Sequence, residues 1–142
     1  MKESPIVTEG LYDAPIEKVW KAFTDKNQMK QWYFDMKEFK PELGFEFQFS
    51  GGTEAKTYLH LCKITEVVPQ KKLTHSWRYD GYSGDSLVAI EFSTEKNQTK
   101  VKLTHSGIET FPSGNADFAI KNFEQGWKEI LGSNLKKFLA EH

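Results

Sequence analysis

Hydrophobic and polar residues alternate through most of the middle of the chain, between Gly44 and Ser106. In the segment Phe45–Ser50 every second residue is phenylalanine, which is the two-residue period of a strand with one buried face. Short turn-forming stretches separate the alternating segments, so we expect neighbouring strands to run antiparallel. The other predicted strands are Ile6–Tyr12, Lys56–Val67, Leu73–Tyr79, Val88–Phe92 and Val101–His105.

The last part of the chain, from about Asn115 to Leu139, has the period of one long amphipathic helix. We expect its apolar stripe to pack on the sheet, because no later segment of the chain could cover it. Charged residues fall between the members of the stripe, which are Ile120, Phe123, Trp127, Ile130, Leu131, Leu135 and Phe138.

Two short helices are expected after the first strand. Pro15 suits the first position of a helix, because an N–H there would have no partner within the helix, and Asp13 or Ala14 would be the cap. Asp25 is a second capping residue and predicts a short helix over Lys26–Trp32.

These elements predict an α+β fold. About seven antiparallel strands would form a curved sheet around the long C-terminal helix, and the two short helices would close one end of the groove between them. A chain of 142 residues without an obvious linker predicts one domain over residues 1–142.

The composition narrows the possible functions. A net charge of −1 without a run of basic residues argues against nucleic acid as a partner. The single cysteine, Cys62, cannot form an internal disulfide, and its strand position indicates a buried, inert thiol. No apolar signal segment or membrane-spanning stretch is present, so we expect a cytoplasmic protein.

Several local motifs, in this order, resemble the START-like helix-grip superfamily, also called SRPBCC. The most similar branch contains the C-terminal domain of the activators of the heat-shock-protein-90 ATPase and its stand-alone bacterial relatives. Each motif is weak alone, but the ordered set spans nearly the whole chain. The residues that carry it are Asp13–Asp25, Trp32, Ile64–Pro69, Leu73, Trp77, Thr99–Gly107 and Gly126–Trp127.

The resemblance implies a cavity between the long helix and the sheet, which relatives use for lipids, polyketides and other apolar or aromatic molecules. It also implies a possible chaperone partner. The eukaryotic activators carry a separate N-terminal domain, for which this chain has no room, and this weakens the chaperone interpretation. Gly126 is unfavourable within a helix, so we expect the helix backbone to approach the sheet or a ligand closely there.

Large aromatic residues on the predicted inner faces are the candidates for contact with a ligand, although they could equally form a packed core. Trp32 and Phe34 would lie at the opening of the groove, and His75 and His105 would share its walls. The complete candidate set is Trp32, Phe34, Phe47, Phe49, Tyr58, His75, Trp77, Phe92, His105, Phe123 and Trp127, with Phe118 as a further possible wall residue.

Polar candidates are few. His60, His75 and His105 could bind zinc only if three separate strands oriented them inward together, and no carboxylate accompanies them, so we expect neither a metal nor a cofactor. Hydrogen-bonded core histidines are the simpler interpretation. Arg78, the only arginine, could bind a ligand carboxylate, but the alternation places it on the outer face, where a surface ion pair is expected.

Three functions remain open, and no catalytic residue is identified. The first is a module that binds an apolar or amphipathic small molecule in the groove. The second is an enzyme in the same cavity, such as a cyclase or hydrolase, which would need an inward polar group with a shifted pKa. The third is a chaperone-associated interaction domain, which would need an exposed patch away from the groove.

Overall fold

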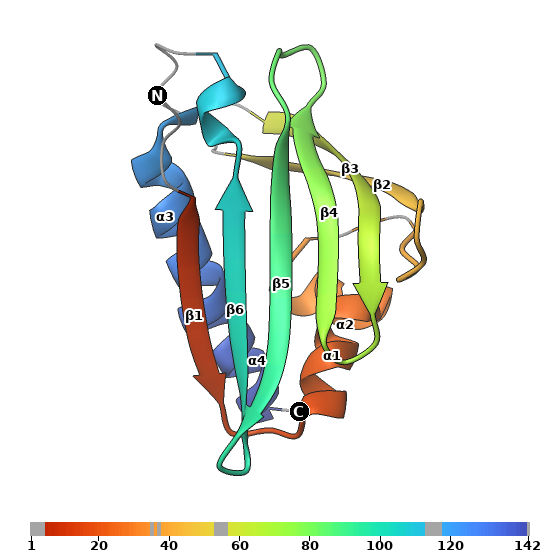
Figure 1. The fold of residues 1–142 in the computed structure, drawn as a ribbon, viewed down its shortest axis with the longest axis vertical. Helices are drawn as coiled ribbons and strands as arrows, with labels where there is room; N and C mark the ends of the chain where they lie inside the picture. The colour runs from red at the N-terminus through yellow and green to blue at the C-terminus, as the bar shows by residue number, and fades with distance from the viewer. Residues whose placement is uncertain (1–4, 35, 37, 53–56, 113–117, 142) are drawn as a thin grey trace.

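Six antiparallel strands form one sheet, and the helices lie behind it (Figure 1). The structure is a computed structural model and describes residues 5–34, 36, 38–52, 57–112 and 118–141. The strand order is β1-β6-β5-β4-β3-β2, so β1 and β2 form the two edges. In Figure 1, β2 and the start of β3 cross behind β4 and β5, so the sheet is strongly curved. The strands are β1 (Ile6–Tyr12), β2 (Glu46–Gly52), β3 (Thr57–Val68), β4 (Lys72–Tyr79), β5 (Ser86–Glu95) and β6 (Gln98–Ser106).

The α+β helix-grip class is therefore confirmed, but the described residues hold six strands rather than about seven. Each of the six corresponds to one of the six alternating segments in the sequence, so the total of about seven was one strand too many. The predicted start of a strand at Lys56 lies outside the described residues. No helix within the described ranges is both long enough and apolar enough to cross a membrane.

The two short helices, α1 (Ile16–Thr24) and α2 (Lys26–Trp32), follow β1 as predicted. The predicted cap of α1, at Asp13 or Ala14, was wrong. Pro15 has extended backbone and is itself the cap, since its carbonyl accepts the N–H groups of Lys18 and Val19. Asp25 caps α2 as expected, since its carboxylate accepts the backbone N–H of Asn27 at 3.1 Å.

The C-terminal helix is continuous but not uniform. It comprises α3 (Ile120–Glu129), a π-helical segment η3 (Ile130–Leu135) and α4 (Lys136–Glu141). The predicted start at Asn115 lies outside the described residues, and Ala119 has extended backbone, so the described helix begins at Ile120. The inward residues are buried at intervals of four: Phe123, Trp127, Leu131, Leu135 and Leu139.

The π-helical segment helps this four-residue spacing to face the sheet throughout. In a regular α-helix each step of four residues overshoots a full turn by about 40°, so the stripe would spiral away from the sheet. The wider π turn takes up part of this rotation. The Tyr12 hydroxyl in β1 donates to the Leu131 carbonyl at 2.7 Å, which ties this segment to the sheet, and Lys18 Nζ donates to the Leu139 carbonyl at 3.0 Å.

Gly126 does not mark a close approach of the helix to the sheet, so this part of the interpretation was wrong, while the approach of a ligand stays a prediction. A Cβ atom added at Gly126 would meet no atom within 4 Å, since the residue lies at the flank of the apolar stripe. The inward neighbour Trp127 makes the contact with the sheet instead.

The Gly126→Ala variant is therefore expected to be more stable than the parent by about 1 kcal/mol, because alanine loses less backbone entropy in a helix. Urea unfolding followed by circular dichroism measures this. Gly84→Ala is the matched control and should destabilise, since Gly84 has φ +105° and an added Cβ would lie 2.6 Å from the Thr110 carbonyl oxygen. A loss of stability in Gly126→Ala would contradict the structure.

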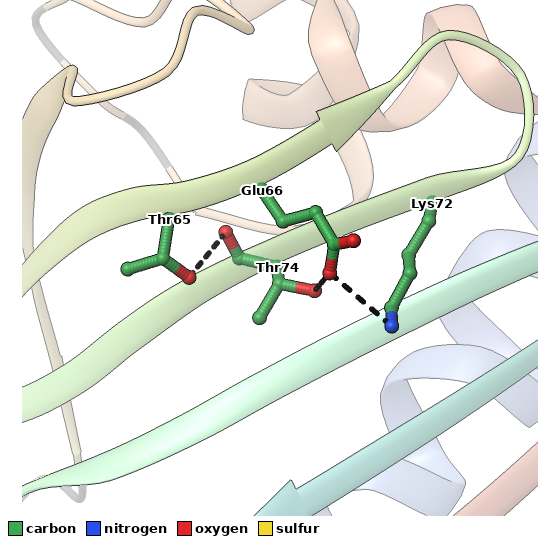
Figure 2. A network of polar contacts seen from close by, with 4 residues as sticks. All are labelled: Thr65, Glu66, Lys72 and Thr74. Atoms are coloured by element: carbon green, nitrogen blue, oxygen red, sulfur yellow. Dashed lines mark hydrogen bonds and ion pairs between the residues drawn. The ribbon is translucent and has the colours of Figure 1, made fainter.

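A register shift interrupts the β3–β4 pairing between Ile64 and Glu66. Figure 2 shows the polar contacts on this part of the hairpin: Thr65 donates to the Thr74 carbonyl and Thr74 donates to Glu66. Lys72 Nζ lies 3.2 Å from the same Glu66 carboxylate. These side chains stabilise the hairpin where the backbone ladder changes register.

Candidate functional site

The inner face of the sheet and the C-terminal helix share a continuous aromatic network. Trp77 of β4 lies 5.3 Å from Trp127 of α3 and 5.6 Å from Phe49 of β2, measured between ring centroids. His105 of β6 lies 5.2 Å from Phe123. The network extends along the predicted candidates Phe34, Phe47 and His75 through further ring contacts.

Tyr58 and Phe92 lie at opposite ends of this network. Tyr58 contacts Tyr79, Tyr82 and Phe118, beside the start of the C-terminal helix. Phe92 contacts Trp20 and Phe23 of α1, and Phe23 in turn contacts Trp32. The structure thus places every predicted aromatic candidate in one buried or half-buried cluster.

The polar centre of this cluster is a chain of hydrogen bonds through His105. The indole N–H of Trp127 donates to His105 Nδ1 at 3.0 Å, so Nδ1 is the unprotonated ring nitrogen. The proton of the neutral ring is then on Nε2, which donates to Ser86 Oγ at 2.8 Å, and Ser86 donates to the Trp77 carbonyl at 2.7 Å. Each group in this chain has a partner, and His105 is 0% exposed.

The two other inward histidines bond to backbone. His60 Nδ1 lies 3.0 Å from the Tyr58 carbonyl oxygen, and His75 Nδ1 lies 2.9 Å from that of Ser76. Because a carbonyl only accepts, Nδ1 carries the proton in both rings. The prediction of hydrogen-bonded core histidines agrees with this geometry.

Burial lowers the pKa of all three histidines. The pKa of His60 falls to about 4 and that of His75 to about 4, in each case against a smaller opposing effect of hydrogen bonds to backbone. The pKa of His105 falls to about 3, through burial and then through the neighbouring His75. A neutral imidazole with such a pKa is poorly matched to general acid–base catalysis near pH 7.

No group of three potential metal ligands occurs among the described residues. Cys62 is a buried free thiol, as predicted. Burial raises its pKa, and the nearby Arg78 guanidinium lowers it in part. Arg78 itself is exposed on the outer face, also as predicted, but no carboxylate within the described ranges lies within 4 Å of it.

A surface pocket of about 450 Å³ lies between α2 and the far end of the C-terminal helix. Trp32 and Tyr33 line one side, and Asn134, Lys137 and Phe138 line the other. Tyr33 is half-buried; its ring is stacked on that of Trp127 at a centroid distance of 6.3 Å and is tilted against that of Phe49 at 6.1 Å. Tyr33 therefore stands between this pocket and the aromatic network.

The sequence interpretation missed Tyr33 and Ser86. Tyr33 follows the last residue of α2 with irregular backbone, at φ −118° and ψ −105°, so no periodicity orients its ring. The run of aromatic residues from Trp32 to Phe34 was its one sequence signal. Ser86 pairs with Trp77 across the sheet, but a serine beside a loop gives no pattern from which that contact can be predicted.

Comparison with known proteins places most of the chain in one family. The family model described as "Activator of Hsp90 ATPase homolog 1-like protein" matches residues 13–140. The search of curated proteins gave no match.

Solved structures share the fold. CalU16 from Micromonospora echinospora is 28% identical, with a TM-score of 0.75, over 96% of this chain and 76% of its own. CV1439 from Chromobacterium violaceum is 19% identical, with a TM-score of 0.81, over 96% of each chain. DynU16, a protein of the dynemicin biosynthetic locus, is 18% identical with a TM-score of 0.80; the match covers 97% of this chain but only 48% of DynU16.

Proposed function

Because the chain belongs to the family of activator of Hsp90 ATPase homolog 1-like proteins and has the START-like helix-grip fold, we propose that it binds an apolar or aromatic small molecule between the C-terminal helix and the sheet. The candidate contact residues are the aromatic set predicted from the sequence, with Tyr33 added. The location of DynU16 in a biosynthetic locus supports a small biosynthetic product or intermediate as the kind of ligand.

The position of Tyr33 is the observation that carries this proposal. The ring separates a pocket of about 450 Å³ from Trp127 and Phe49. Burial raises the pKa of its hydroxyl, and the neighbouring Cys62 and Tyr79 raise it further. Rotation of this one side chain would join the pocket to the aromatic network.

The ligand therefore competes with Tyr33 for space. The network around Trp77 and Trp127 is filled by side chains at ring distances of about 5 to 6 Å, so binding requires a state in which Tyr33 has moved. When only a fraction of the molecules is competent to bind, the apparent Kd rises in inverse proportion to that fraction.

Removing the ring should therefore strengthen binding. We expect Tyr33→Ala to lower the Kd for an apolar aromatic ligand by about tenfold if the open state is populated at about 10%. Tryptophan fluorescence titrations with oleate and with the aromatic polyketide emodin measure this. Leu43→Ala, at a position 74% exposed, is the control and should leave the Kd unchanged.

The same titration identifies the site. Trp127→Phe should remove the part of the fluorescence change that comes from the network side of Tyr33, where Trp127 stacks on its ring. The remaining change should come from Trp32, which stacks on Tyr33 at 5.2 Å and lines the pocket. If neither the parent nor Tyr33→Ala gives a saturable signal with either class of ligand, the proposed function is wrong. Docking on a chaperone stays a prediction of the family resemblance.

A further inference from the structure

A second hollow, of about 590 Å³, lies on the opposite side of the sheet from the C-terminal helix, over β2, β3 and β4. Arg78, Lys63 and Gln48 line it with outward side chains, and Leu61 gives it an apolar part. This hollow is separate from the groove in which the aromatic ligand is proposed to bind.

The hollow coincides with a break in the β3–β4 ladder. Leu61 pairs with Arg78 and Ile64 pairs with His75, but the two described residue pairs between them are not bridged. The backbone N–H of Lys63 donates to Ser76 Oγ at 3.0 Å, and the Ser76 carbonyl lies 2.9 Å from His75 Nδ1. The Ser76 side chain thus takes the place of a backbone acceptor here, and the buried Cys62 lines the hollow.

The charges around the hollow leave Arg78 available. Glu46 and Glu38 also line it, but Glu46 is directly opposite Lys63 in the β2–β3 register, so these two neighbours offset each other. The cross-strand neighbour of Arg78 in β3 is the uncharged Leu61. No carboxylate within the described part of the chain lies within 4 Å of the Arg78 guanidinium. The guanidinium is close enough to Cys62 to lower the pKa of the Cys62 thiol.

We propose that this outer hollow binds a small carboxylate that carries an apolar group. The Arg78 guanidinium would hold the carboxylate through two parallel hydrogen bonds, a geometry that a lysine cannot supply. Ser76 accepts the Lys63 N–H, so its hydroxyl proton is left to donate to a ligand oxygen. The half-buried Leu61 side chain would contact the apolar group.

Phenylacetate is the test ligand, in a titration of the full chain followed by amide NMR. We expect saturable shifts at the backbone amides of Lys63, Ser76 and Arg78, while the Trp127 indole N–H, which reports on the groove, stays in place. Arg78→Gln should raise the Kd by about tenfold or more, the value of a lost hydrogen bond to a charged group. Lys102→Gln removes the same charge from an exposed position of β6 and should leave the Kd unchanged.

Two further arms define the ligand class. Leu61→Thr should weaken phenylacetate binding, because it removes the apolar contact. Inorganic phosphate should bind more weakly than phenylacetate, because phosphate has no apolar group. Equal binding of phosphate and phenylacetate would overturn the proposal, as would an unchanged Kd in Arg78→Gln. Shifts confined to the Trp127 indole would also overturn it, yet would support the separate proposal of a ligand in the groove.

Discussion

Lowering the pH from 7 to 5 is expected to reduce the free energy of unfolding by about 6 kcal/mol, or about 2 kcal/mol for each of three buried histidines. In the folded protein the pKa values of His60 and His75 are about 4 and that of His105 is about 3, against 6.5 for an ordinary histidine. Below pH 6.5 the unfolded chain therefore binds protons that the folded protein excludes. The stabilisation is complete above pH 6.5 and is lost as the pH falls towards 4.

Urea unfolding at half-unit steps of pH measures this loss. Near pH 5 each histidine contributes about 1.4 kcal/mol per pH unit to the slope, so the three together give about 4 kcal/mol per unit. In His75→Gln, whose amide can still donate to the Ser76 carbonyl, the slope should fall by one third. NMR titration of the folded protein provides the direct check, and a histidine of this cluster that titrates near pH 6.5 would refute the explanation.

Replacing Trp127 by alanine is expected to destabilise the protein by about 4 kcal/mol or more. Loss of a buried tryptophan costs about 3–5 kcal/mol through the cavity that it leaves. The substitution also removes the indole N–H that donates to His105 Nδ1, and an unpaired buried acceptor costs about 1–3 kcal/mol. Thermal and urea unfolding give the measured loss.

Trp127→Phe separates the two effects, because it keeps most of the ring volume and removes the N–H. It should cost about 1–3 kcal/mol. Trp20→Phe is the matched control, since Trp20 packs on Phe92 and its indole nitrogen has no hydrogen-bond partner among the described residues, so it should cost less than about 1 kcal/mol. Equal losses in the two variants would mean that the His105 hydrogen bond contributes nothing.

The inner face of the sheet was predictable because alternation alone decides which side chains share a face. His75 and Trp77, and Leu103 and His105, are buried as their two-residue period requires. The π-helical segment was not predictable, since a stripe of four-residue steps also fits an ordinary amphipathic helix. The outward position of Arg78 was predictable, whereas the unpaired stretch beside it was not, because the polar alternation of β3 and β4 continues through it.

The hydrogen bonds that close the fold join residues far apart in the chain. Tyr12 bonds to Leu131 and Lys18 to Leu139, across 119 and 121 positions, and β1 pairs only with β6. During synthesis the first strand therefore has no partner until most of the chain has left the ribosome. Such long-range pairing makes folding slow and late, and the apolar face of β1 needs protection from aggregation while it waits.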